Sequence, residues 1–309
     1  MKRCALIFLI IIVFATACSP AAQTATPAPV ATTAVPTASP TLTATPTITI
    51  SQTATIQPTE TWVPPLPQAE AEEMVIELLK NNGGCRLPCF WGFVPGEITY
   101  QTFISQLSTF KNLDRLFNIL RNENIIDIAF SYGYSEDPFV TIESFRVRMT
   151  NYWVFESENE KYNVYEYDNP YFVEYTQYYS LSKILFNYGP PERVLMYPIL
   201  REPPMIVENR LHLFLDYAES GWNIDYIMPL SKDGNYYIGC PAQAMVGLAL
   251  WTPGDTEIAA ASIRSLEDYY TFPIEEATSL SLDEFHEQFQ DPAQCLKTPI
   301  DIWPQSAAE

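Results

Sequence analysis

The feature that most constrains this chain is a long segment that cannot form a hydrophobic core. Residues 19–65 contain 14 Thr and 9 Pro among Ala and a few other residues, and Glu60 is the single charged one. Such a segment buries too little apolar surface to offset the entropy of ordering it, and its prolines favour extended polyproline II. We therefore expect a disordered tether that reaches at most ~145 Å, at ~3.1 Å per residue.

The segment before the tether has the pattern of an export signal. Lys2 and Arg3 precede an apolar run over residues 6–14, which is shorter than the ~20 residues of a membrane-spanning helix. The run ends in Ala15-Thr16-Ala17-Cys18, which resembles a bacterial lipobox. We expect residues 1–17 to be removed as a lipoprotein signal peptide and Cys18 to carry lipid chains, palmitate among them. The mature chain would then be anchored to the membrane by lipid and would not span it. An ordinary secretory signal with an accidental cysteine is the alternative.

The remaining residues, 68–309, carry nearly all of the aromatic and charged side chains. Removal of the signal leaves 15 basic residues against 37 acidic ones, a net charge of −22. This excess argues against binding to nucleic acid through its phosphates and against docking on anionic lipid. The segment is long enough to bury a large core.

Apolar periodicity and capping residues predict five helices, over residues 69–82, 100–110, 113–121, 181–187 and 282–290. Thr99 and Ser180 stand at two N-caps, and Ser281 with Glu284 forms a capping box. Strands are predicted over residues 125–132, 139–149, 152–167, 192–197, 211–217, 222–228 and 244–251.

Strands follow strands in this order without regular alternation with helices. We therefore expect an α+β fold, an antiparallel sheet with a few short packed helices, preceded by the disordered N-terminal tether. The lipidated Cys18 and the tether occupy residues 18–67, and residues 68–309 form a single globular domain. A repeated order of helix, tight turn and strand allows an internal repeat, with halves 68–175 and 176–309.

Four cysteines remain in the globular part: Cys85, Cys89, Cys240 and Cys295. An even number of cysteines in an exported chain indicates disulfides, and three pairings are open. The short spacing favours Cys85–Cys89 and leaves Cys240–Cys295. A redox pair or a four-thiolate zinc site is the alternative, but the spacing differs from the CxxC of those sites.

The first cysteine pair opens the run CRLPCFWGFVPGEIT, residues 85–99. This run resembles a motif of exported lipoproteins of Chloroflexi-type bacteria, C-x-L-P-C-aromatic-W-G, which follows a Thr/Pro linker. Tyr188-Gly189-Pro190-Pro191 and Leu215-x-Tyr217 are also similar to that group. The family has no established activity, so the resemblance implies no catalytic residue. More distantly, the Pro-Gly-x-Thr run before a helix is similar to the small α+β domains of outer-membrane-assembly lipoproteins.

The sequence gives little support for catalysis. His212 and Asp216 lie on one face of a predicted strand, and such a pair can orient a base, but no nucleophile motif accompanies it. His286 is expected at the rim of its helix. Glycoside hydrolysis uses a pair of carboxylates, but such pairs are expected by chance among 37 acidic residues, and no sequence motif distinguishes one of them. No phosphate-, dinucleotide- or metal-binding motif is present in the sequence, so we expect no catalytic residue, cofactor or metal.

An aromatic and acidic stretch, residues 152–179, offers a binding surface. Its candidate residues are Tyr162, Tyr165, Tyr167, Tyr171 and Tyr175. Exposed tyrosines beside acids and Asn suit a glycan or protein ligand. A strand pair with aromatic cross-strand packing explains the same pattern without any ligand.

Together these features predict a lipid-anchored, extracytoplasmic binding or envelope-structural module at the cell surface. The membrane is its partner through Cys18, and a glycan or a protein is its expected ligand. The alternative is a surface hydrolase that acts on polysaccharide or peptide.

Overall fold

The computed structural model describes residues 65–303, except residues 111–115, 122–123, 134, 157–160, 201–208, 265 and 267–268. The predicted signal peptide, Cys18 and the tether up to residue 64 lie outside the described residues, as do residues 304–309. Within the described ranges, no helix is both long enough and apolar enough to cross a membrane.

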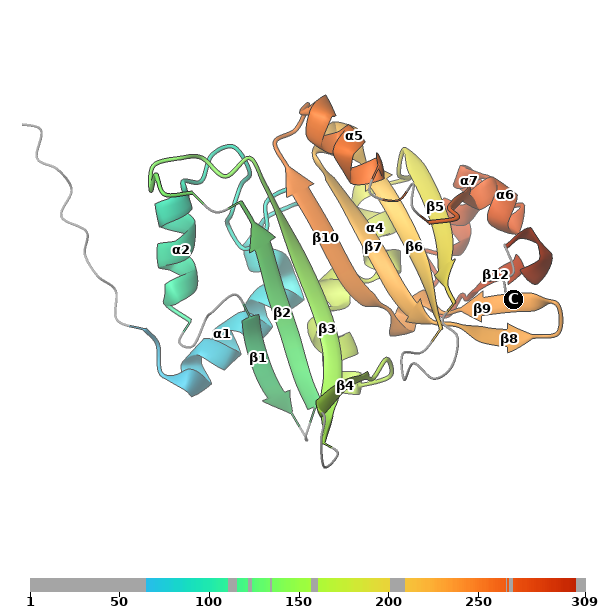
Figure 1. Ribbon diagram of the computed structural model, residues 1–309, viewed down its shortest axis with the longest axis horizontal. Helices are drawn as coiled ribbons and strands as arrows, with labels where there is room; N and C mark the ends of the chain where they lie inside the picture. Colours follow the sequence, from blue (N-terminus) through green and yellow to red (C-terminus); the bar gives the residue numbers. More distant parts are fainter. Residues whose placement is uncertain are drawn as a thin grey trace, which may run out of the picture. The chain divides into compact units, whose positions relative to one another are not determined.

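The predicted α+β fold is confirmed, and an antiparallel sheet is its main element (Figure 1). In the described part of the chain the strand order is β1-β2-β3-β10-β7-β6-β5-β11, and β4 also pairs with β3. Their bounds are β1 (Leu116–Arg121), β2 (Asn124–Tyr132), β3 (Ser144–Glu156), β4 (Lys161–Tyr165), β5 (Arg193–Ile199), β6 (Arg210–Tyr217), β7 (Trp222–Pro229), β10 (Met245–Trp251) and β11 (Phe272–Pro273). A smaller sheet has the order β12 (Leu296–Pro299), β9 (Tyr236–Gly239) and β8 (Ser231–Asp233).

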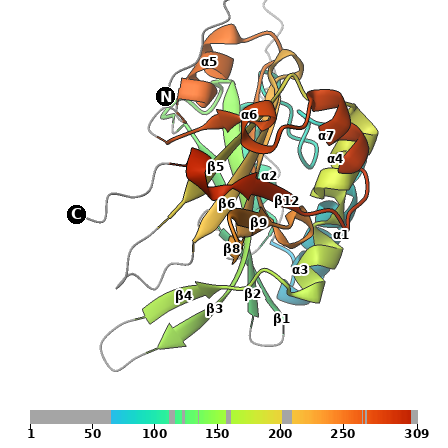
Figure 2. The same ribbon diagram turned by 90° about the vertical axis from the view of Figure 1, so that its right-hand side faces the viewer.

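Short helices cover the large sheet unevenly. Helices α1, α3 and α4 lie against one face, and α5 lies on the opposite side, as Figure 2 shows with the sheet close to edge-on. The helices are α1 (Gln68–Asn81), α2 (Tyr100–Ser108), α3 (Pro170–Tyr175), α4 (Leu181–Tyr188), α5 (Thr256–Arg264), α6 (Ile274–Thr278) and α7 (Leu282–Gln288). One face of the sheet is therefore buried, and much of the other is open.

The helices with explicit caps begin where the sequence predicts. Thr99 accepts a hydrogen bond from the N–H of Thr102 at the start of α2, and Ser281 forms a reciprocal capping box with Glu284 at the start of α7. Ser180 stands at the N-cap of α4, but its side chain makes no capping hydrogen bond. Such caps satisfy backbone donors that a helix leaves unpaired.

One predicted helix is wrong. Residues 116–121 of the predicted helix 113–121 form β1, where Ile119 lies opposite Ile126 of β2 and both side chains are buried. An apolar pattern this short fits either period, and so short a helix is marginal without tertiary support. The adjacent strand supplies a hydrogen-bond ladder and a buried partner, so the extended form is favoured.

The aromatic segment 152–179 is also more varied than predicted. It contains the end of β3, all of β4 and then α3. The Oδ1 atom of Asn169 accepts hydrogen bonds from the N–H groups of Tyr171 (2.9 Å) and Phe172 (3.3 Å), and Pro170 occupies the first helical position. Asn followed by Pro is a helix-start signal, which the aromatic content of the segment had masked.

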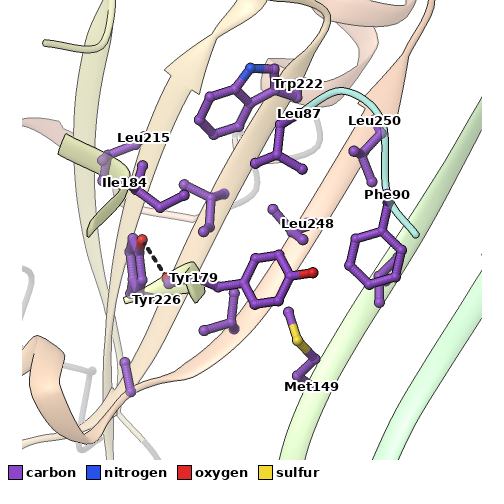
Figure 3. Close-up of a cluster of buried hydrophobic side chains, with 14 of the residues drawn as sticks. Leu87, Phe90, Met149, Tyr179, Ile184, Leu215, Trp222, Tyr226, Leu248 and Leu250 are labelled. Carbon is purple, nitrogen blue, oxygen red and sulfur yellow. Dashed lines mark hydrogen bonds between the residues drawn. The ribbon is translucent and has the colours of Figure 1, made fainter. Parts of the chain in front are cut away.

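The core lies between the sheet and the helices (Figure 3). Trp222, Tyr226 and Leu248 project from the sheet and are fully or almost fully buried. The hydroxyl of Tyr226 donates to the backbone carbonyl of Tyr179, 2.9 Å away, so the one polar atom of this ring is satisfied. Burial of each large apolar side chain contributes roughly 1.5–3 kcal/mol.

The cysteines pair as their spacing predicts. Cys85 and Cys89 form one disulfide, with Cα atoms 5.8 Å apart, and Cys240 and Cys295 form the other, with Cα atoms 4.2 Å apart. The second disulfide joins the residue after β9 to the residue before β12, which are neighbours in the small sheet. It therefore fixes the C-terminal strand to the rest of the domain.

A buried asparagine organises the first disulfide loop. Asn82, which ends α1 with a left-handed backbone (φ 55°), is 0% exposed. Its Nδ2 donates to the carbonyls of Cys85 (2.9 Å) and Cys89 (2.8 Å). Its Oδ1 accepts from the N–H of Trp91 (3.2 Å) and from the hydroxyl of Tyr179 (2.9 Å). One side chain thus holds the helix end, the loop and the core together.

Candidate ligand-binding groove

The candidate site is the open face of the large sheet, which faces the viewer in Figure 1. Successive side chains of a strand point to opposite faces. On β6, Leu211, Leu213 and Leu215 pack in the helix-covered core, and His212 lies on the open face, as the sequence predicts. This alternation places polar and charged side chains from each of the strands β2 to β7 on one surface.

Small residues of β10 form the floor of a groove on this surface. Gly247 lies opposite Arg148 of β3 on one side and Asp225 of β7 on the other. Ala249 is flanked in the same way by Arg146 and Asn223. Because the middle strand carries almost no side-chain bulk, larger residues on both sides enclose a groove of about 610 Å³.

Ser262 of helix α5, together with Leu266 and Tyr269, forms one wall. The Nδ2 of Asn223 donates to the Oγ of Ser262 on α5, 2.5 Å away. Leu266 packs with Phe214 in a small apolar cluster separate from the main core. These contacts hold the wall to the sheet, which is how a single short helix can border a stable groove.

A histidine, an aspartate and two tyrosines form a connected network in the groove. The Nδ1 of His212 lies 2.9 Å from the Oδ2 of Asp225, and the hydroxyl of Tyr197 donates to the same oxygen over 3.4 Å. The rings of Tyr197 and His212 stack with centroids 4.4 Å apart, and Tyr269 stacks on the other side of Tyr197 at 5.1 Å. Burial, together with the Asp225 carboxylate, raises the pKa of Tyr197, so its hydroxyl stays protonated and remains a donor.

The second ring nitrogen of this histidine has no partner. His212 is 6% exposed, and its Nε2 is buried without a hydrogen bond from any described residue. No serine, threonine or cysteine in the described ranges therefore bonds to Nε2 as a nucleophile would. Because Asp225 accepts from Nδ1, we assign the proton of the neutral ring to Nδ1, which leaves Nε2 as an acceptor.

An arginine and a tyrosine border another part of the groove. The guanidinium of Arg210 lies over the ring of Tyr165, 4.4 Å from its centroid, a cation–π contact between β6 and β4. The Nε of Arg210 is buried and, like the Nε2 of His212, has no hydrogen-bond partner among the described residues. Both atoms belong to open-face residues of β6 that are two positions apart.

The other cations come from β3. Arg146 and Arg148 are exposed and line the groove, and neither forms an ion pair with another described residue. Asp127 on the neighbouring strand is 8% exposed, and burial raises its pKa from 3.8 to about 6, although Thr150 and Arg148 oppose the shift. Within an acidic chain, the described residues that line the groove carry more positive than negative side chains.

Of the five predicted binding tyrosines, the structure brings one to the groove, Tyr165. Tyr167 and Tyr175 are buried, with 7% and 8% exposure, and Tyr171 lies on α3, on the opposite side of the sheet. The side chain of Tyr162 lies outside the described residues. The helical form of α3 separates these residues, which a continuous strand would have aligned.

The sequence-based pairing of His212 with Asp216 is wrong. Residues four positions apart on a strand are ~13 Å apart, too far for a hydrogen bond. Asp216 instead accepts a charge-assisted hydrogen bond from Arg193 on β5, with Nη2 to Oδ2 at 2.6 Å. Asp225 on the adjacent strand takes its place beside the histidine. His286 lies on α7, and its Nε2 donates to the backbone carbonyl of Leu185 on α4, 3.2 Å away.

Sequence reasoning missed the arginines of the groove, although one signal was present. In β3, Arg146 and Arg148 alternate with the buried Phe145, Val147 and Met149. Such alternation indicates a strand with one buried and one charged face. In the described part of the chain, no group of three or more His, Cys, Asp or Glu side chains is arranged to hold a metal ion.

Comparisons with family models, with characterised proteins and with solved structures find no significant match.

Proposed function

We propose that this protein is a membrane-tethered, extracytoplasmic binding module whose groove holds a small molecule. The groove of about 610 Å³ carries the proposal, because ligand sites typically measure ≈ 300–1,000 Å³ and combine apolar walls with a few placed polar groups. Here Tyr165, Tyr197 and Tyr269 supply ring surfaces, and Arg210 and His212 supply the polar atoms. The signal pattern, the tether and the two disulfides support the location.

The glycine in the groove floor gives a direct test of this function. A Cβ atom on Gly247 would come no closer than 3.8 Å to another residue, and its backbone angle is one that any residue adopts. Gly247→Ile therefore fills the groove without a clash, and isoleucine suits a strand. Gly133→Ile is the matched control, since a Cβ there also meets nothing within 4 Å and Gly133 does not line the groove.

The measurement uses the mature chain, residues 18–309 with Cys18→Ser, exported so that the disulfides form. The probe is N-phenyl-1-naphthylamine, a neutral aromatic molecule that fluoresces when it binds. We expect saturable binding to the parent and to Gly133→Ile and its loss in Gly247→Ile, with far-UV circular dichroism unchanged. Absence of saturable binding, or equal binding by Gly247→Ile, would refute the groove as a binding site.

The tether is tested separately by metabolic labelling with palmitate. We expect label on the chain with Cys18 and none on Cys18→Ser, together with release of the variant from the membrane fraction. Equal labelling of the two chains would refute the anchor and leave the groove untouched.

A hydrolase that acts on polysaccharide or peptide is the second candidate. The Asp225–His212 pair favours it, because a carboxylate that holds Nδ1 leaves Nε2 as a base. Release of dye from labelled casein or from 4-methylumbelliferyl glycosides by the mature chain, and its loss in His212→Gln, would support this candidate. No release by the parent would exclude it for these substrates.

A further inference from the structure

We propose that the groove selects a small organic anion, with its acidic group over Gly247 and Ala249 beside Arg146 and Arg148, and its ring against the tyrosines. This inference rests on the proposed function and specifies its ligand class. It follows from three observations: the position of the arginines, the local balance of charge, and two buried nitrogens without partners.

The arginines are placed to reach one group in the groove. Arg146 and Arg148 are two positions apart on β3, so their Cα atoms are ~7 Å apart on the same face. Both side chains are longer than the ~4.8 Å spacing between strands. The adjacent residues of β10 are Ala249 and Gly247, which leave room above them. An acidic group in that room accepts hydrogen bonds from both guanidinium groups, a geometry that suits carboxylate, phosphate or sulfonate.

Among the described residues that line the groove, positive side chains outnumber negative ones, although the chain has a net charge of −20. These residues include three arginines, and Asp225 is the one carboxylate among them. The oxygens of Asp225 already accept hydrogen bonds from the Nδ1 of His212 and the hydroxyl of Tyr197, so this carboxylate is held by neutral donors and not by the arginines. Asp127 on β2 is buried, accepts a hydrogen bond from the hydroxyl of Thr150 over 3.5 Å and interacts with Arg148. With this carboxyl group included, the three arginines still outnumber these two acids. Charges beyond ~8 Å are largely screened at physiological salt, so the distant acids of the surface do not decide what binds here.

Two buried nitrogens on β6, across the groove from the arginines of β3, have no hydrogen-bond partner among the described residues. Arg210 and His212 both line the groove, and the Nε–H of Arg210 and the Nε2 of His212 are unsatisfied among the described residues. Buried polar atoms in folded proteins almost always have partners, so two such atoms side by side on β6 indicate a site for a ligand. A hydroxyl group of the ligand satisfies both, because its oxygen accepts from the Nε–H of Arg210 and its hydrogen is donated to the Nε2 of His212. The stacked rings of Tyr197 and Tyr269 border the planar part of the ligand.

Two probes that differ by one acidic group test the proposal. 8-Anilinonaphthalene-1-sulfonate carries the same rings as N-phenyl-1-naphthylamine together with a sulfonate. We expect the mature chain to bind the sulfonate about tenfold more tightly than the neutral probe. Gly247→Ile removes binding of both, because it fills the space that they share.

Charge-removing variants locate the acidic group. We expect Arg148→Gln and Arg146→Gln each to weaken binding of the sulfonate about tenfold and to change binding of the neutral probe less than about twofold. Lys183→Gln is the control, since Lys183 is exposed on α4 on the other side of the sheet, and it should change neither.

The outcomes separate the inference from the proposed function. Equal affinities for the two probes, or an unchanged sulfonate affinity in both arginine variants, would overturn the selection of anions. The groove would still stand as a binding site if Gly247→Ile abolished binding of the neutral probe. If Gly247→Ile bound both probes as the parent does, neither proposal would survive.

Discussion

Replacement of Asn82 by alanine is the sharpest test of how the domain is held together. The side chain is fully buried and uses all of its hydrogen-bonding capacity, two donors and two acceptor positions. Alanine leaves two carbonyls, the N–H of Trp91 and the hydroxyl of Tyr179 without this partner. The same residue has a left-handed backbone, which asparagine tolerates better than alanine.

The expected magnitude follows from these contacts. Four hydrogen bonds at about 1 kcal/mol each give a loss of about 4 kcal/mol in the free energy of unfolding. The left-handed backbone adds about 1 kcal/mol for alanine, so we expect a total of about 5 kcal/mol for Asn82→Ala. Asn82→Gly avoids the backbone cost and should lose about 4 kcal/mol. For a domain of this size, the alanine variant should melt about 10–20 °C below the parent.

Urea unfolding without reductant measures these values, with tryptophan fluorescence and far-UV circular dichroism as two probes of one transition. Asn81→Ala is the matched control, because Asn81 is exposed and accepts a single hydrogen bond, from the N–H of Gly83 at 2.8 Å. Its loss should stay below about 1 kcal/mol. The reasoning fails if Asn82→Ala loses less than about 2 kcal/mol, or if the two neighbouring variants lose the same amount.

Three further predictions concern other parts of the domain. Burial raises the pKa of Asp127 to about 6, so the stability that its protonated form contributes is present below about pH 4 and is lost as the pH rises through 6, by at most about 3 kcal/mol. Asp127→Asn should remove this pH dependence from the free energy of unfolding, measured by urea unfolding across pH. An unchanged pH dependence in the variant would contradict the prediction. Replacing Cys240 and Cys295 together by alanine should lower the free energy of unfolding by about 4 kcal/mol, because their disulfide closes a loop with a sequence separation of 55. A loss under about 1 kcal/mol would count against this entropic account of the disulfide. Gly221→Ala should cost more than about 2 kcal/mol, since its φ is 81° and the new Cβ would lie 2.5 Å from the carbonyl oxygen of Trp251; a melting temperature equal to that of the parent would show that the turn can adjust.

Local chemistry made much of the fold predictable. Thr99 and the pair Ser281 and Glu284 fixed the starts of two helices because a cap acts on residues three positions away. The predicted strands over residues 211–217 and 222–228 correspond to β6 and β7, and Gly221, in the left-handed region, ends the turn between them. The helix prediction over 113–121 failed because its outcome depends on β2, a partner strand that a short pattern does not reveal.

The groove was largely beyond sequence reasoning. The outward position of His212 follows from alternation along its own strand, and so does that of Arg148. That Asp225 partners this histidine depends on the register between β6 and β7, and that Arg148 faces Gly247 depends on β10 pairing with β3. Such pairings join residues far apart in the sequence, where no local preference acts.

The central position of β10 has a consequence for how the chain matures. Residues 245–251 insert between β3 and β7, so the edges of those strands that pair with β10 stay unpaired until residue 251 has been synthesised. A chain that stops before Met245 would hold two half-sheets with bare edges, which are templates for aggregation. β10 also supplies Gly247 and Ala249, which form the floor of the groove. Because Leu266 and Tyr269 also line the groove, binding of a probe would report that synthesis has passed residue 269 and that the two half-sheets have joined.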